Sequence, residues 1–392
     1  MFPYLLVFII ATIYLLMSST VRDEKNRFLL ACFFMYAALF IGLGDMIGGY
    51  DRYIYGSGFD AIADEMRRTR DLSHVVYLVH SNEYGYFYWE VFVSLFTENR
   101  YIFILVTTLL AYLLYYQAFK KYIEDYPLGV ILFLGLFYYF TMTYLRQVIA
   151  CGIAWQSFRY IWQRKPVPFF ALVLIAYTFH SSAVFFLPAY FIPTKKYSQE
   201  FIIKILAISL IIGLTPLSIR LLATQDDKGS AGWAYSEQMQ GFRIEYVLEV
   251  IAFVFIIFKN YRSISNDKKE LTMLNLSFVY CAGLLIFMRF GQGGRMFWFY
   301  FFPIIYTFVN LANNRNAYSW VRPALFVMSL LLFLRITFAW STQNVPYKTF
   351  LTNGEPCGDG TIYRQYEYNQ GYTANKFIRK AWDPVWDRNR DF

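Results

Sequence analysis

The sequence predicts an all-α polytopic membrane protein with about twelve transmembrane helices, some of them broken or re-entrant. Of its 392 residues, 57% are hydrophobic, 22% are aromatic and only 16% are charged, which is too apolar for a soluble protein of this length. Apolar runs close to the length of a membrane span recur along the chain, and basic residues gather in the loops between alternate runs. Together these observations predict helices that cross a membrane many times.

A spanning helix needs roughly 20 apolar residues, and fewer when it is broken or lies inside a bundle. The first run, Pro3–Met17, lacks a basic leader and a small-residue cleavage site, so we expect a span and not a cleaved signal peptide. The expected spans lie at about residues 2–19, 28–45, 101–119, 127–145, 147–162, 166–180, 181–193, 200–222, 244–260, 271–289, 296–312 and 320–339.

The short loops indicate the orientation of these spans. Six loops carry 17 Lys or Arg and 7 Asp or Glu, a net charge of +10, whereas the rest of the chain has 19 basic and 20 acidic residues, a net charge of −1. The positive-inside rule places the six loops in the cytoplasm, so both termini are expected on the outer side. The six loops are Ser18–Arg27, Lys120–Tyr126, Arg159–Pro166, Thr194–Lys204, Lys259–Glu270 and Asn313–Arg322.

Two regions are expected: a transmembrane domain over residues 1–340, with an outer loop at about 45–89, and an outer tail over 341–392. In the outer loop, apolar residues at helical spacing among abundant charges predict an amphipathic helix over Gly58–Leu72. The following stretch, Asn82–Phe96, is short for a span and carries acidic residues, which predicts a re-entrant or interfacial helix.

Composition and motifs exclude several functional classes. Three of the four cysteines fall in apolar spans and the three histidines lack metal-ligand spacing, so we expect neither a disulfide framework nor a metal site. The net charge of +9 belongs to the cytoplasmic loops, so nucleic acid is not an expected partner. The motifs G-x-S-x-G, H-E-x-x-H, C-x-x-C and the P-loop are absent, which argues against a hydrolase, a metalloprotease or a nucleotide-driven enzyme.

A hairpin of two apolar arms between Thr143 and Pro188 places Arg146 and His180 at equivalent outer ends, with Gln147 beside the arginine. A cation at the edge of a hydrocarbon span is costly unless it lines a polar cavity or snorkels to the interface. The hairpin therefore predicts a polar, functional side of the membrane.

Other polar residues are expected on the same outer side. Asp51 and Arg52 follow a glycine pair, Glu83 precedes the short outer helix, and Arg289 and Arg295 flank the glycine-rich turn FGQGG. Glycines let a backbone approach a ligand closely, and arginine forks suit phosphate. Several arginines at one membrane surface predict a lipid-linked phosphate or pyrophosphate as the ligand.

Structural explanations stay open for these residues. An interfacial arginine commonly snorkels, and His180 is as consistent with a buried, hydrogen-bonded histidine as with a catalytic one. Asp51 also suits a turn after the glycines. Glu245 and Glu249, four residues apart, are better explained by pairing with Arg243 than by catalysis.

Five short motifs occur in an order and spacing that resembles the EpsG-like family of bacterial exopolysaccharide and capsule polymerases. The resemblance runs from about Asp45 to Pro303, and the tail after Trp340 has no counterpart in it. The motifs are GGYDRYIY (48–55), EYGYFYWEVFVSLF (83–96), YLRQVIACGIA (144–154), FHSSAVFFLP (179–188) and GGRMFWFYFFP (293–303).

This resemblance implies a Wzy-type glycosyltransferase with an architecture similar to the membrane-embedded GT-C enzymes. Such a polymerase joins oligosaccharide repeat units carried on undecaprenyl pyrophosphate at the outer face of the bacterial cytoplasmic membrane. The implied partners are the lipid-linked donor and acceptor, membrane lipid and a chain-length regulator. No cofactor is required, although a divalent metal is compatible with the reaction because arginines can replace it.

Family residues correspond to Asp51, Glu83, Arg146, Gln147, His180 and Arg295, whereas Arg289 comes from the turn alone. We expect the catalytic base to be Asp51, then His180, then Glu83 in order of preference. The arginines, with Arg52 and Gln147, are expected to hold the pyrophosphate. Two alternatives remain open: a ligase that moves finished glycan to an acceptor, and a transporter or flippase for lipid-linked sugars. The paired, discontinuous helices typical of transporters are missing from the sequence.

Overall fold

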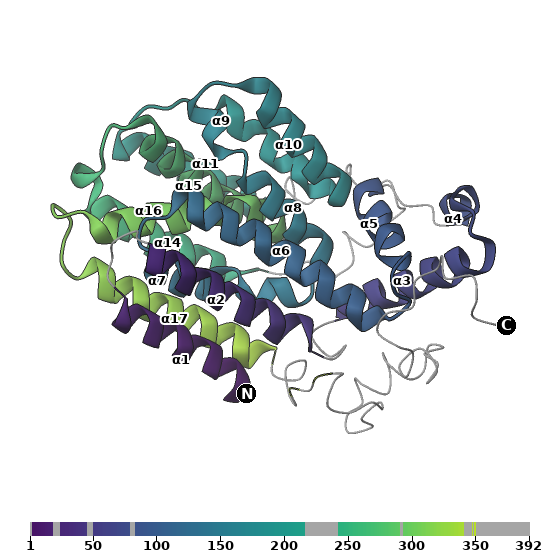
Figure 1. The fold of residues 1–392 in the computed structure, drawn as a ribbon. Helices are drawn as coiled ribbons and strands as arrows, with labels where there is room; N and C mark the ends of the chain where they lie inside the picture. Colours follow the sequence, from purple (N-terminus) through teal and green to yellow (C-terminus); the bar gives the residue numbers. More distant parts are fainter. Residues whose placement is uncertain are drawn as a thin grey trace. The chain divides into compact units, whose positions relative to one another are not determined.

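Helices make up almost all of the part of the chain that the structure describes (Figure 1). The computed structural model describes residues 2–18, 24–44, 50–78, 83–215, 242–290, 293–340, 347 and 349. Within them the one β-type pairing is an isolated bridge between Gly44 and Thr349. The helices are α1 (Phe2–Met17), α2 (Glu24–Gly42), α3 (Tyr50–Thr69), α4 (Leu72–Leu78), α5 (Tyr84–Ser94), α6 (Arg100–Tyr122), α7 (Tyr126–Leu136), η2 (Tyr138–Met142), α8 (Leu145–Trp155), α9 (Phe158–Trp162), α10 (Pro166–Phe179), η3 (Ser181–Phe191), α11 (Gln199–Leu214), α14 (Ile244–Lys259), η4 (Tyr261–Ser263), α15 (Lys268–Ile286), η5 (Gly293–Tyr300), α16 (Phe301–Asn313) and α17 (Val321–Ala339), where η marks a 3₁₀-helix.

The predicted all-α polytopic membrane class is confirmed. Among the described residues, five helical segments are long and apolar enough to cross a membrane, and several shorter helices are also apolar. The five are Lys25–Gly42, Arg100–Tyr122, Lys268–Ile286, Gly293–Asn313 and Val321–Ala339. The total of about twelve spans and their orientation stay predictions, and nearly all of the predicted tail lies outside the described residues.

Side-chain caps explain where several helices begin. The side chain of Asn99 accepts hydrogen bonds from the backbone N–H groups of Tyr101 and Ile102 at the start of α6. Asp125 accepts from Leu128 at the start of α7, and Asp267 accepts from the first residues of α15. Such caps satisfy the donors that a first helical turn leaves without a partner.

Three of the predicted spans are shorter or more irregular than expected. The predicted span 127–145 divides into α7 and the short η2, and 147–162 divides into α8 and α9. Both α7 and α8 have 11 residues, a length of about 16 Å, which is about half of the hydrocarbon thickness. The predicted span 181–193 is the 3₁₀-helix η3, which contains Pro188, a residue that cannot donate a backbone hydrogen bond.

The chain forms two compact units, which we describe separately. The first comprises Met1–Ile153, Leu174–Ser181 and Phe326–Phe392, and the second comprises Ala154–Val173 and Ser182–Leu325. In the first unit α2 packs along α6 and α1 along α7. In the second unit α15 packs against α11, α14 and α16. Both cores are helical and largely aromatic or aliphatic.

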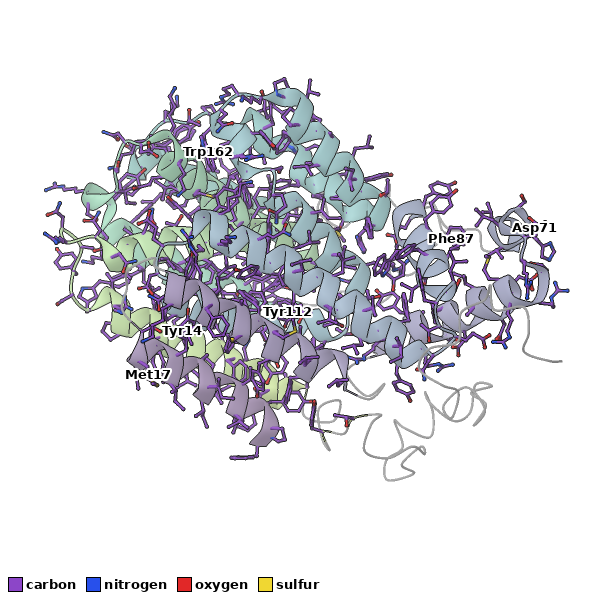
Figure 2. The ribbon with its side chains drawn as sticks, viewed as in Figure 1. Tyr14, Met17, Asp71, Phe87, Tyr112 and Trp162 are labelled. Atoms are coloured by element: carbon purple, nitrogen blue, oxygen red, sulfur yellow. The ribbon has the colours of Figure 1, made fainter. Side chains whose placement is uncertain are left out.

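Aromatic side chains fill the core of the first unit. Tyr112 of α6 is buried among other side chains (Figure 2) and contacts the rings of Phe34 from α2 and Phe133 from α7 edge to face. Its hydroxyl hydrogen bonds to the hydroxyl of Thr141 at 3.0 Å. The polar end of this large residue is thus satisfied inside the core, as burial of a tyrosine requires.

Helix α3 is fixed to the start of α6 in the first unit. A buried ion pair joins Asp60 of α3 to Arg100, the first residue of α6. The ring of Phe59 stacks on that of Phe103, with centroids 4.3 Å apart. The sequence predicted an amphipathic helix at 58–72, and the structure confirms the helix but begins it eight residues earlier, at Tyr50.

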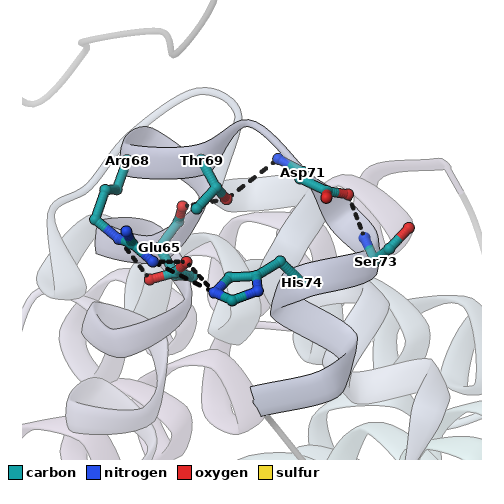
Figure 3. A network of polar contacts seen from close by, with 6 residues as sticks. All are labelled: Glu65, Arg68, Thr69, Asp71, Ser73 and His74. Carbon is teal, nitrogen blue, oxygen red and sulfur yellow. Dashed lines mark hydrogen bonds and ion pairs between the residues drawn. The ribbon is translucent and has the colours of Figure 1, made fainter.

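At its other end α3 meets α4 in a network of exposed polar contacts (Figure 3). Glu65 accepts a hydrogen bond of 2.6 Å from Arg68 and lies 3.0 Å from His74. The hydrogen bond from Arg68 lowers the pKa of the Glu65 carboxyl. Exposed pairs of this kind contribute little to stability.

Loss of one partner from the buried Asp60–Arg100 pair should destabilise the protein. Asp60→Ala leaves a buried guanidinium without its counter-charge, a change that costs about 3–5 kcal/mol. The measurement is thermal unfolding of purified protein in detergent, with Glu200→Ala, which removes the exposed Lys204–Glu200 pair, as the control. Equal melting temperatures of the two variants would show that the Asp60–Arg100 pair does not hold α3.

Candidate functional site

Glu83 joins three segments of the first unit. It stands at the N-terminus of α5, where its Oε2 accepts a hydrogen bond of 2.5 Å from the Nη1 of Arg146 in the first turn of α8. Its Oε1 accepts from the backbone N–H of Ser181 at 3.2 Å. Because Ser181 directly follows His180, one carboxylate links α5, α8 and the segment at the end of α10. The two predicted residues Glu83 and Arg146 therefore lie in contact, and the backbone next to His180 is the third part of the group.

Arg146 is held by aromatic rings as well as by Glu83. The centre of its guanidinium lies 5.0 Å from the ring centroid of Tyr55 in α3 and 5.9 Å from that of Tyr86 in α5. Stacking of this kind fixes a guanidinium plane and leaves its edge available for an anion. The side chain is 31% exposed, so the charge is neither buried nor free in solvent.

A glycine allows α5 to approach α10 closely enough for this arrangement. A Cβ at Gly85 would lie 2.2 Å from the Oγ1 of Thr178, the residue before the last one of α10. No side chain fits in that space. The position of Glu83 therefore depends on glycine at position 85, two residues further along the chain.

Two further polar residues of α5 belong to this group, although the sequence analysis did not select them. Tyr86 and Glu90 are 4% and 7% exposed. They follow Glu83 by three and seven residues, a spacing that places all three on one helical face. An acidic residue in a short apolar helix is the sequence signal that could have identified Glu90. We call Tyr55, Glu83, Tyr86, Glu90 and Arg146 the Arg146 cluster.

Burial raises the pKa of the Glu90 carboxyl to about 8; the nearby charge of Arg146 lowers this pKa and that of Glu83 raises it. Helix α5 is outside the candidate spans. Because desolvation disfavours the ionised form, the carboxyl is largely protonated at neutral pH.

The other predicted residues of the first unit lie in different settings. Arg52 is buried and donates hydrogen bonds to the carbonyl oxygens of Gly44 at 2.7 Å and Gly42 at 3.4 Å, at the end of α2. A cation at this position stabilises a helix C-terminus. Asp51 lies in the first turn of α3, four residues before Tyr55, but its side chain is outside the described part. Gln147 is buried next to Arg146.

Arg289 and Arg295 belong to the second unit. Arg289 donates a hydrogen bond of 3.1 Å to the carbonyl oxygen of Leu214 at the end of α11. Arg295 lies over the ring of Trp298, with 5.7 Å between the guanidinium and the ring centroid. Their predicted binding of pyrophosphate stays a prediction.

Packing explains the two glycines of the FGQGG turn that the structure describes. A Cβ at Gly293 would lie 2.5 Å from Phe287, and one at Gly294 would lie 2.8 Å from the hydroxyl of Tyr246. Close approach by the protein itself thus accounts for these glycines. The other two residues between Phe290 and Gly293 lie outside the described residues.

Among the described residues, no group of three or more His, Cys, Asp or Glu side chains is arranged to hold a metal ion. The expectation that the protein needs no cofactor stays a prediction.

Introduction of a side chain at Gly85 should disturb the Arg146 cluster. Gly85→Ala places a methyl group against Thr178 and pushes the start of α5 away, at a cost of about 1–3 kcal/mol. Thermal unfolding in detergent measures the effect. Gly58→Ala in α3 is the matched control, because its Cβ would be 3.8 Å from the nearest atom, an ordinary contact distance. If Gly85→Ala is as stable as the control, the close approach of α5 and α10 is not required.

Comparison with protein families finds the same family that the sequence motifs resemble. The model of the EpsG family matches residues 28–349, a range wider than the 45–303 covered by the motifs. No curated protein and no solved structure matches the chain. Since the family match covers most of the chain, and the helices are those of a multi-pass membrane protein, the chain belongs to the EpsG family of polymerase-like membrane proteins of polysaccharide biosynthesis.

Proposed function

We propose that this protein is a Wzy-type polymerase that joins undecaprenyl-pyrophosphate-linked oligosaccharide repeat units at the outer face of the bacterial cytoplasmic membrane. Its donor and acceptor are both lipid-linked, its fold is of the GT-C type, and both termini face outward. Family membership and the charge asymmetry of the loops support this proposal. The single observation that carries it is the partly exposed Arg146, which is oriented by Glu83 and two tyrosines.

Arg146 is suited to a pyrophosphate because its present partner can be exchanged. Glu83 satisfies its Nη1, while its Nε is buried and has no hydrogen-bond partner within the described residues. A pyrophosphate carries more negative charge than one carboxylate and accepts several hydrogen bonds. The ligand therefore replaces or joins Glu83 at a guanidinium that the tyrosine rings already hold in place, so little reorganisation accompanies binding.

In the reaction, a hydroxyl oxygen of the acceptor sugar attacks the anomeric carbon of the donor. The new glycosidic bond forms as the bond from that carbon to the pyrophosphate oxygen breaks, and the electron pair leaves with the pyrophosphate. Arg146 stabilises the charge that develops on the leaving group. The hydroxyl proton passes to a base, for which the sequence offers Asp51, His180 and Glu83.

The geometry of Glu83 favours a positioning role over a role as base. Both of its oxygens already accept hydrogen bonds, from Arg146 and from the backbone of Ser181. A carboxylate that is engaged in this way is a weaker proton acceptor. We therefore assign Glu83 to the orientation of Arg146.

Substitution of Arg146 should abolish polymerisation in vitro with lipid-linked repeat units. Loss of a donor to the developing charge costs about 100- to 1,000-fold in rate, so Arg146→Ala makes almost no polymer. Arg146→Lys keeps the charge but loses the planar fork and gives intermediate activity. Arg295→Ala is expected to behave like Arg146→Ala.

The matched control is Arg68→Ala, which removes an exposed arginine of the α3–α4 network. Wild-type chain lengths from Arg146→Ala at normal protein level would contradict the proposal. A wild-type protein that attaches finished glycan to an acceptor without lengthening it would be a ligase. A wild-type protein that moves lipid-linked glycan across a vesicle membrane without bond formation would be a transporter.

A further inference from the structure

Glu90 is a buried carboxyl, only 7% exposed, beside a buried hydroxyl that lacks a partner. The hydroxyl of Tyr86, one turn earlier on the same face of α5, has no hydrogen-bond partner in the described part. A buried polar group that lacks a partner destabilises a fold. Such a hydroxyl next to a buried carboxyl and an arginine points to a ligand that supplies the missing hydrogen bond.

A glycine of α3 lies beside this carboxyl. Gly58 of α3 is exposed, and a Cβ at this position would lie 3.8 Å from the Oε1 of Glu90. Because Gly58 has no side chain, α3 places no Cβ against the carboxyl at this position. Gly56 lies two residues earlier in the same helix. Glycine weakens a helix interior, so its use here is consistent with close approach of another group.

Burial and neighbouring charges set the pKa of the Glu90 carboxyl. Burial favours the protonated acid, the neighbouring Arg146 opposes this effect, and Glu83 reinforces it, which gives a pKa of about 8. The carboxyl therefore ionises just above neutral pH, where a group can both accept and release a proton. The titratable and charged groups of the elements around it are Tyr55 of α3, Glu83 and Tyr86 of α5, Arg146 of α8, and the Asp60–Arg100 pair between α3 and α6.

We infer that Glu90 is the base of the polymerisation reaction: beside Gly58 it takes the proton of the acceptor sugar hydroxyl, while the hydroxyl of Tyr86 hydrogen bonds to the same sugar. This inference rests on the proposed function. As the acceptor oxygen bonds to the anomeric carbon, its proton moves to the Glu90 carboxylate, and the electron pair of the broken bond leaves on the pyrophosphate. The proton then passes to solvent, which restores the carboxylate.

The test compares Glu90→Gln and Glu90→Asp with wild-type protein in the polymerisation assay across a range of pH. Glutamine has the shape of the protonated acid but cannot accept the proton, so Glu90→Gln should be at least about 100-fold slower while it still binds lipid-linked repeat units. Wild-type activity should rise with pH through a midpoint near pH 8 and level off above it, because the ionised fraction of Glu90 rises through its pKa. That rise should be absent from Glu90→Gln and shifted to lower pH in Glu90→Asp.

Two further variants separate this role from a structural one. Glu65→Gln, which changes an exposed glutamate in the network of Figure 3, should keep the wild-type rate and pH profile. Gly58→Leu leaves the carboxyl in place but covers it, and should lose activity while its melting temperature stays close to that of Gly58→Ala. Infrared difference spectra of wild type against Glu90→Gln should show the signal of a protonated carboxylic acid, which falls to half near pH 8.

The outcomes distinguish this inference from the function on which it rests. Wild-type protein that makes no polymer would overturn both. Wild-type polymerisation with an unchanged rate or pH profile in Glu90→Gln would overturn the role of Glu90 alone. If the Gln variant fails to fold, full activity of Gly58→Leu would overturn it in the same way.

Discussion

The hydrogen-bonded pair of Glu83 and Arg146 is the interaction on which the candidate site depends. The carboxylate accepts from the guanidinium and from the backbone of Ser181, so a single side chain sets the relative position of α5, α8 and the end of α10. Both partners stand in or beside the first turn of a helix. Since the pair is only partly buried, its net contribution to stability is modest, and its main effect is on geometry.

The rest of the first unit supports this pair. The Asp60–Arg100 ion pair and the stacked rings of Phe59 and Phe103 fix α3 to α6, and α3 carries Tyr55 against Arg146. Helices α7 and α8 are short because the chain turns through η2 between them. That break places the start of α8, with Arg146, at the position where Glu83 lies. Irregular backbone of this kind is tolerated in membrane proteins where it is covered by protein or lines a polar space.

The sequence predicted much of the fold and part of the site. Apolar periodicity was sufficient for the helical class, and an arginine and a glutamate in apolar surroundings were sufficient to select Arg146 and Glu83. The 11-residue helices were beyond prediction because hydropathy does not separate one continuous span from two halves joined by a turn. Arg52 shows a similar limit: its motif suggested a ligand contact, but the contact with the carbonyl of Gly44 depends on how α3 returns to α2. The sequence could not distinguish Tyr55 and Tyr86 from the other tyrosines of its 35, since only tertiary structure shows which rings contact a guanidinium.

The proximity of Arg146 to Glu90 also links the two halves of the proposed reaction. The positive charge of Arg146 lowers the pKa of Glu90, so it favours the ionised carboxylate that can accept a proton. An anion bound at Arg146 offsets that charge and therefore raises the proton affinity of Glu90. By linkage, a proton on Glu90 strengthens the binding of the anion by the same factor. As negative charge grows on the departing pyrophosphate, the base thus becomes stronger at the step in which the hydroxyl gives up its proton. A site with Glu83 as the base would lack this coupling, because Glu83 and the pyrophosphate would compete for the same guanidinium.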